Sequence, residues 1–154
     1  PDRIGLQKNR DMFLSKRLAA RHIGYADSMY ARLTGKKAPR TNRPELIAKH
    51  GYDTKAAFHA IRLLMQGHEM LLRQTMTMPM TDLKREYLLS VRNGEVPENQ
   101  VLADIEHWRD EIKDAEWLTP LPEGPDYAKI NKWLIDVHEE AWDDMAHSRW
   151  ASGK

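Results

Sequence analysis

A row of polar side chains follows Gly51, and it is the stretch of the sequence whose spacing most suggests chemistry. The row consists of Lys55, His59, Arg62 and Gln66, at positions i, i+4, i+7 and i+11. Residues three or four positions apart are neighbours on one face of an α-helix, so these side chains would form a continuous edge of hydrogen-bond donors. Such an edge near a helix N-terminus could bind an anion, for example a nucleotide phosphate. The alternative is a solvated face whose Lys and Arg pair with a neighbouring helix.

The start of this helix is signalled by Asp53 and Thr54, because either side chain can accept a hydrogen bond from the first free N–H groups. We therefore take Asp53, Thr54, Lys55, His59 and Arg62 together as candidate nucleotide- or phosphate-binding residues. No proline interrupts the sequence before position 79, so the pattern predicts a helix over 54–73. Its predicted core face consists of Phe58, Ile61, Met65, His68 and Leu72.

A second group of cations lies in the loop that follows Gly35. Lys36, Lys37, Arg40 and Arg43 fall within eight positions of one another, and such a group could contact the phosphates of a nucleic acid. The alternative is a solvated connector. The loop is therefore a candidate nucleic-acid contact.

The charge is distributed unevenly along a chain of almost zero net charge. Residues 1–74 contain 15 Lys and Arg against 6 Asp and Glu, whereas residues 75–154 contain 9 against 17. A basic half beside an acidic half suggests a polyanion-facing surface in the first half. Alternatively, the two halves neutralise each other where they pack.

The familiar motifs of metal sites and active sites are missing from the sequence. Seven histidines are present, but none belongs to a His-Glu-x-x-His motif, and there is no cysteine. There is also no Walker A sequence, dinucleotide fingerprint or nucleophile elbow, and no strand carries Asp-x-Asp. We predict no metal site and no complete active site in this chain.

The elements that must position these residues are all helical. The pattern predicts an all-α fold, an irregular bundle of about five or six helices in a single domain over 1–154, with flexible ends at 1–9 and 149–154. A Pro-rich extended strap is expected at 117–125, before the last helix. No apolar run is long enough to span a membrane and nothing reads as a signal peptide, so we expect a cytoplasmic protein. The expected helices cover 10–33, 44–50, 54–73, 82–92, 97–116 and 126–148.

Several segments in the same order resemble a known family. They are Tyr52-Asp53-Thr54-Lys55 with His59 and Arg62, the "Leu-x-x-Arg-x-Gly-Glu" segment within 88–95, the Pro-rich segment 121–126, and Phe13-Leu14-Ser15-Lys16 upstream. Together they resemble the C-terminal helical part of a predicted nucleotidyltransferase family of the DNA polymerase beta superfamily, associated with RNA repair. The resemblance spans roughly residues 12–142.

This resemblance implies a helical half that closes over a nucleotide, with Lys55, His59 and Arg62 facing the triphosphate or the acceptor. In such enzymes a separate N-terminal domain carries the carboxylates that bind magnesium and the nucleoside triphosphate. The implied partners are a nucleoside triphosphate, RNA or another nucleic acid, and that N-terminal domain. No cofactor is expected in this chain alone; magnesium and the triphosphate are expected for the complete enzyme. The alternative is a helical nucleic-acid-binding or protein-interaction module without catalysis.

Overall fold

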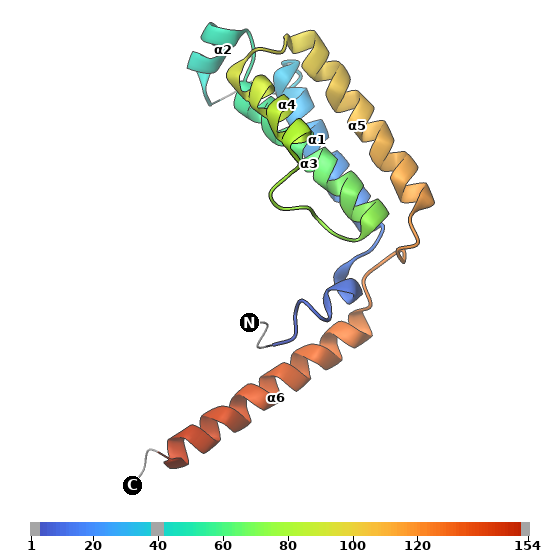
Figure 1. Ribbon diagram of the computed structural model, residues 1–154, viewed down its shortest axis with the longest axis vertical. Helices are drawn as coiled ribbons and strands as arrows, with labels where there is room; N and C mark the ends of the chain where they lie inside the picture. The colour runs from blue at the N-terminus through green and yellow to red at the C-terminus, as the bar shows by residue number, and fades with distance from the viewer. Residues whose placement is uncertain (1–3, 38–41, 152–154) are drawn as a thin grey trace. The chain divides into compact units, whose positions relative to one another are not determined.

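The computed structural model describes residues 4–37 and 42–151, with side chains described as far as residue 143. Within these residues the chain is all-α, as predicted, with no strand (Figure 1). Its elements are a short 3-10 helix, η1 (Arg10–Phe13), and the helices α1 (Arg17–Leu33), α2 (Pro44–His50), α3 (Thr54–Arg73), α4 (Asp82–Asn93), α5 (Glu98–Leu118) and α6 (Tyr127–Ala151).

The contacts group the chain into two compact units. The larger is Lys16–Leu121, and the smaller combines Pro1–Ser15 with Pro122–Lys154. The expectation of a single domain stays a prediction. None of the described helices is both long enough and apolar enough to cross a membrane.

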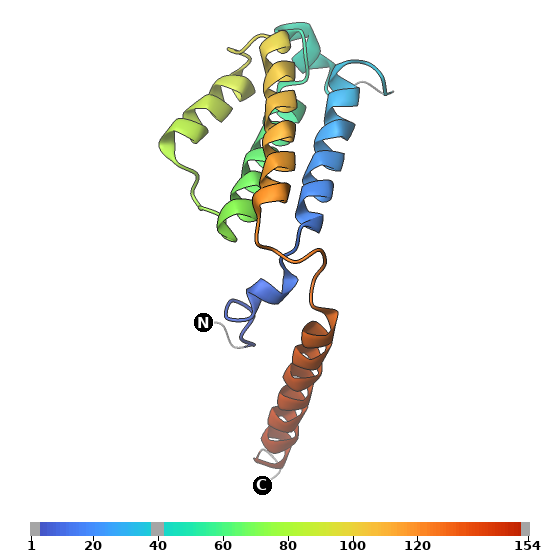
Figure 2. The ribbon, with the colours of Figure 1, turned by 90° about the vertical axis from the view of Figure 1, so that its right-hand side faces the viewer.

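The larger unit is built around α3, which packs against α1, α4 and α5 (Figures 1 and 2). Small residues let the neighbouring helices come close, since Ala57 and Ala60 are fully buried. At Gly67 an added Cβ would lie 2.6 Å from the Cγ of His22, so α1 packs almost directly on the α3 backbone. Close packing of this kind fixes the relative positions of side chains on the two helices.

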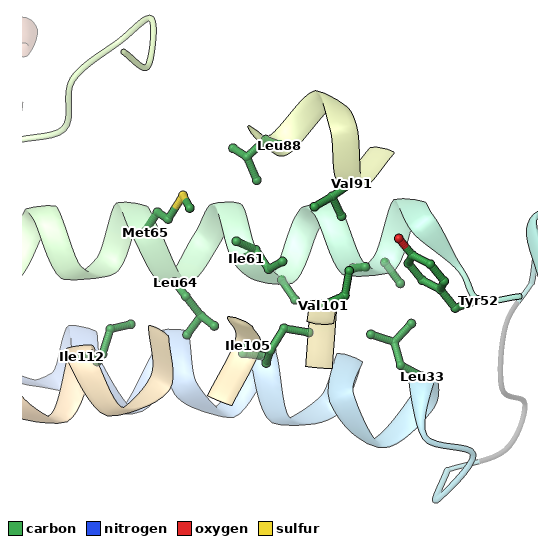
Figure 3. Close-up of a cluster of buried hydrophobic side chains, with 14 of the residues drawn as sticks. Leu33, Tyr52, Ile61, Leu64, Met65, Leu88, Val91, Val101, Ile105 and Ile112 are labelled. Atoms are coloured by element: carbon green, nitrogen blue, oxygen red, sulfur yellow. The ribbon is translucent and has the colours of Figure 1, made fainter. Parts of the chain in front are cut away.

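The core face predicted for α3 is only partly correct. Ile61 and Met65 are buried as predicted, but Phe58 and His68 are half-buried and Leu72 is exposed. The core also includes further α3 residues. Figure 3 shows Ile61, Leu64 and Met65 of α3 among side chains from the surrounding helices. The prediction assumed one apolar stripe, whereas α3 is covered from three directions. These additional residues are Ala56, Ala57, Ala60, Leu64 and Leu71.

The ends of the central helices follow the predicted local chemistry. α3 has the predicted bounds, and the Asp53 carboxylate caps it by accepting a hydrogen bond from the Ala56 N–H at 3.0 Å. Gly51 ends α2 with φ +85° and Gly94 ends α4 with φ +76°, both in the left-handed region that favours glycine.

The helix predicted to begin at Arg10 begins instead at Arg17. Leu14 is extended (φ −81°, ψ 138°) and separates α1 from η1. Tertiary contacts within the smaller unit account for the break. Phe13 packs edge-on against Trp133 with ring centroids 5.7 Å apart, and the Met12 carbonyl accepts a hydrogen bond from the backbone N–H of Asp126 at 3.1 Å.

The Pro-rich strap is shorter than predicted, because α5 continues through Trp117 and Leu118. Thr119 adopts an extended conformation directly before Pro120, as expected for a residue that precedes proline. Its hydroxyl donates to the Leu71 carbonyl at 2.5 Å, which fixes the end of α5 near the end of α3.

At the chain ends, the predicted flexibility is not tested. Residues 4–9 form turns, and the Asn9 side chain donates to the Gly5 carbonyl at 2.9 Å. Residues 149–151 belong to α6, while 1–3 and 152–154 lie outside the described residues.

Candidate functional site

A hollow of about 300 Å³ lies in the larger unit, where the start of α3 meets the neighbouring helices. We call it the cationic hollow. It has an apolar side, formed mainly by Tyr25 and Met29 of α1 with Phe58 of α3, and a polar side that carries three cations and a histidine. The lining residues are Tyr25, Met29, Arg43, Lys55, Ala56, Phe58, His59 and Arg92.

The three cations come from separate elements. Lys55 and His59 lie in the first two turns of α3, Arg43 directly precedes α2, and Arg92 lies in the last turn of α4. The backbone N–H groups at the start of α3 add a partial positive charge to this end of the helix. Cationic side chains brought together in a concave pocket attract anions, and phosphate groups foremost.

A buried carboxylate orients one of these cations. Arg43 donates to Asp53 through Nη2 at 2.8 Å and through Nε at 3.2 Å. This two-point geometry fixes the guanidinium plane. Asp53 is only 4% exposed, also caps α3 and does not itself line the hollow.

Thr54, the other predicted residue at this helix start, is fully buried. Its hydroxyl oxygen accepts a hydrogen bond from Nη1 of Arg92 at 3.4 Å. Asp53 and Thr54 therefore contact the arginines that line the hollow.

The row of polar side chains predicted on α3 lies along one edge of the helix. Arg62 donates through Nη2 to Nδ1 of His59 at 2.9 Å, and through Nη1 to Oε1 of Gln66 at 3.4 Å. Lys55 and His59 line the hollow, whereas Arg62 lies beside it and holds the His59 ring. Since a guanidinium can only donate, the proton of neutral His59 lies on Nε2.

The pKa of His59 is lowered below its ordinary value. Burial is the main cause, and the positive charges of Arg62 and Lys55 add to it. The imidazole is therefore neutral at neutral pH and can donate one hydrogen bond through Nε2. The ring of Tyr25 packs edge-on against it, with centroids 5.1 Å apart.

Of the four cations of the predicted basic loop, the structure describes Lys36, Lys37 and Arg43. Lys36 is exposed, with Nζ 6.0 Å from the centroid of the Tyr30 ring, and Lys37 is also exposed. Arg43 lines the cationic hollow, and Arg40 lies outside the described residues. The nucleic-acid contact assigned to this loop stays a prediction.

Sequence reasoning did not identify Arg92 or the apolar wall as parts of the site. The signal for Arg92 was present, because it is the arginine of the "Leu-x-x-Arg-x-Gly-Glu" segment. No comparable signal marked Tyr25 and Met29, since their role depends on how α1 packs against α3.

A second hollow, of about 280 Å³, lies beside the C-terminal half of α3, and we call it the Trp108 hollow. Lys84 places Nζ 6.0 Å from the centroid of the Trp108 ring. The Glu69 carboxylate also lines the hollow and accepts a hydrogen bond from the Thr77 hydroxyl at 2.5 Å. The remaining lining residues are His68, Leu72, Arg73, Met80 and Thr81.

Neither hollow has the ligand set of a magnesium site. Magnesium is held by several carboxylate and water oxygens, and the described residues contain no group of three or more His, Cys, Asp or Glu placed to hold a metal ion. The residues described here therefore do not fit the metal that the resemblance implies for the complete enzyme.

Comparisons with known proteins give one family. Residues 5–136 match the RNA repair pathway DNA polymerase beta family (RlaP). No curated protein and no solved structure matches the chain. The family match covers the whole of the larger unit, including every residue that lines the cationic hollow, and part of the smaller unit. The chain belongs to the RNA repair pathway DNA polymerase beta family.

Proposed function

We propose that this chain supplies the helical part of a nucleotidyltransferase, in which the cationic hollow binds phosphate groups of the nucleoside triphosphate or of the acceptor. The observation that carries the proposal is the convergence of Arg43, Lys55 and Arg92, from three separate elements, on one hollow. Membership of a DNA polymerase beta family supports the nucleotidyltransferase class.

The chemistry of the hollow suits this role. Phosphoryl transfer spreads negative charge over phosphate oxygens, and fixed cations stabilise that charge. Lys55 and Arg92 would contact phosphate directly, while Asp53 keeps Arg43 oriented toward the hollow. The apolar wall of Tyr25, Met29 and Phe58 would contact the ribose or base. In this proposal magnesium and its carboxylates belong to a separate N-terminal domain.

Thermal-shift titrations test the proposal, with inorganic triphosphate, ATP, CTP, GTP and UTP as separate probes. We expect each probe to stabilise the chain, and the Lys55→Ala/Arg92→Ala variant to bind about 100-fold more weakly, because two charge-assisted contacts are lost. The matched control is Arg85→Ala/Lys113→Ala, which removes two exposed cations of α4 and α5 and should leave the affinity unchanged. Stabilisation that survives in the Lys55→Ala/Arg92→Ala variant would contradict the proposed site.

A second candidate function, a helical module that binds nucleic acid without catalysis, is favoured by the charges of the larger unit. Residues 16–74 carry 12 Lys and Arg against 4 Asp and Glu, and residues 75–121 carry 5 against 10. In the ion pair between Asp27 of α1 and Arg109 of α5, at 2.9 Å, the positive charge of Arg109 neutralises one of the acidic side chains within residues 16–74. This candidate predicts binding to single-stranded RNA that weakens steeply as salt is raised.

A further inference from the structure

The Trp108 hollow has no part in the proposed phosphate site, and its chemistry differs from that of the cationic hollow. It lies wholly within the larger unit. Glu69 and Arg73 reach it from α3, and Lys84 and Trp108 reach it from α4 and α5. Its volume of about 280 Å³ is near the lower end of the range for pockets that bind small molecules. The hollow is therefore large enough for one small ligand.

The carboxylate of Glu69 is held in place beside this hollow. Its Oε1 accepts a hydrogen bond from the Thr77 hydroxyl at 2.5 Å, and this bond is the main cause that lowers the pKa of Glu69. The positive charges of Lys84 and Arg73 lower the same pKa further, so the carboxylate is ionised at neutral pH. Since an ionised carboxylate has two oxygens and accepts several hydrogen bonds, Glu69 can accept one more from a ligand.

The indole of Trp108 gives the hollow a flat aromatic surface. It is half-buried, and the ring of His68 packs edge-on against it with centroids 5.6 Å apart, which restricts its movement. Nζ of Lys84 lies 6.0 Å from the centroid of the six-membered or five-membered indole system, at the outer limit of a cation–π contact. This contact is weak, so another ring can replace the Lys84 ammonium over the indole.

The charges that line the hollow restrict the kind of ligand it can hold. Glu69 disfavours a simple anion, and Arg73 and Lys84 disfavour a simple cation. A purely apolar ligand would displace water from these charges without replacing its hydrogen bonds, which is unfavourable. The lining therefore fits a neutral, flat ring that offers N–H donors to the carboxylate and acceptor atoms to the two cations.

We infer that the Trp108 hollow binds a nucleobase with an exocyclic amino group, stacked on Trp108 and donating from that group to Glu69. Adenine and cytosine carry the amino donor beside an acceptor atom, to which Lys84 or Arg73 can donate. Uracil has a carbonyl where cytosine has the amino group, so it offers Glu69 no such donor. Stacking on an aromatic side chain is a common way for proteins to hold unpaired bases. This site is separate from the proposed phosphate site and does not depend on it.

The first experiment titrates the full chain with adenosine, cytidine and uridine and follows the indole N–H signals by NMR. Nucleosides carry no phosphate and inorganic triphosphate carries no base, so failure of one site is read separately from failure of the other. We expect adenosine and cytidine to shift the Trp108 signal, identified by its loss in Trp108→Phe, with about millimolar affinity, and uridine to bind about fivefold more weakly. Trp117, which is 87% exposed, is the internal control. No shift at Trp108, or equal shifts at both indoles, would overturn the inference.

The base belongs either to a free nucleotide or to a single strand, and a second experiment distinguishes the two sources. Adenosine monophosphate and tetraadenylate are titrated against the Lys55→Ala/Arg92→Ala variant, with binding read at Trp108, so that the cationic hollow does not contribute. A strand predicts about tenfold tighter binding of tetraadenylate, weakened by raised salt, because further phosphates reach the exposed Arg73. A free nucleotide predicts equal affinities for the two probes.

The third experiment tests the contact assigned to Glu69. Glu69→Gln keeps the size of the side chain and an oxygen for the Thr77 hydroxyl but removes the negative charge. We expect it to bind adenosine about fivefold more weakly, because a charge-assisted hydrogen bond becomes a neutral one, and to bind uridine as before. The matched control is Asp114→Asn, which neutralises an exposed carboxylate of α5 and should leave both affinities unchanged. Unchanged adenosine affinity in Glu69→Gln would overturn the inferred contact.

Discussion

The two hollows beside α3 have nearly the same volume but differ in whether a carboxylate is among their lining residues. Each contains a half-buried histidine, His59 in the cationic hollow and His68 in the Trp108 hollow, and burial is the main cause that lowers the pKa of both. The difference lies in the carboxylates. Asp53 is buried behind the cationic hollow, where it orients Arg43, whereas Glu69 lines the Trp108 hollow.

This difference shows that counting cations is not enough to identify a phosphate site. Arg73 and Lys84 line the Trp108 hollow, but Glu69 lines it as well and would repel an anion. The residues that line the cationic hollow include three cations and no carboxylate, and Asp53 pairs with Arg43 from outside the lining. We therefore expect the two hollows to respond differently to the same anion and to matched substitutions.

The largest effect is expected from substituting Asp53, because its carboxylate both caps α3 and pairs with Arg43 of the cationic hollow. Asp53→Ala removes the cap of α3 and the partner of Arg43, and we expect it to lower the free energy of unfolding by about 2 kcal/mol. Chemical denaturation measures this change.

Two controls separate the cap from the charge. Asp53→Asn keeps an oxygen that can cap the helix and should cost about 1 kcal/mol. Asp82→Ala removes an exposed carboxylate from the first turn of α4, which pairs only at the surface with Arg85, and should cost less than about 0.5 kcal/mol. Equal losses for Asp53→Ala and Asp82→Ala would argue against the support role of Asp53.

The next effect concerns the protonation of His59. Saturating inorganic triphosphate should raise the midpoint of its NMR titration by about one pH unit, because a bound anion favours the imidazolium. By linkage, triphosphate should bind more tightly as the pH falls toward the free His59 midpoint. His68 in the Trp108 hollow is the internal control, and the midpoint of its titration should not change. Equal rises in the midpoints of both histidines would place the anion outside the cationic hollow.

Triphosphate affinity is expected to rise as the pH falls, whereas the stability of the fold without a ligand is expected to fall. The folded pKa of His59 and of His68 lies below the unfolded value of about 6.5, so the unfolded chain binds more protons between the two values. These two histidines therefore make the fold less stable as the pH falls below about 6.5.

The smallest effect is expected from the Trp108 hollow. Arg73→Ala/Lys84→Ala removes as many positive charges as Lys55→Ala/Arg92→Ala, but we expect it to change triphosphate affinity by less than about twofold, since screening weakens distant charges. Calorimetric titration at physiological salt measures both. A comparable loss of triphosphate affinity in the two variants would mean that the overall positive charge of the protein, and not the cationic hollow, attracts the anion.

Much of the helical framework could be predicted from the sequence because its signals are local. Gly51 and Gly94 end helices through their own backbone freedom, and Asp53 caps α3 through a contact three residues away. The edge formed by His59, Arg62 and Gln66 also follows from spacing alone. These features depend on neighbours within about one helical turn.

The break at Leu14, the burial of α3 on three sides and the wall of the cationic hollow were decided by tertiary structure. Arg92 reaches Thr54 across 38 sequence positions, and Tyr25 meets His59 only because α1 packs closely on α3. Helical periodicity states which residues share a face, but it does not state which faces meet. The sequence by itself determined the helices and their polar edge, whereas packing between distant segments decided which cations gather in one hollow.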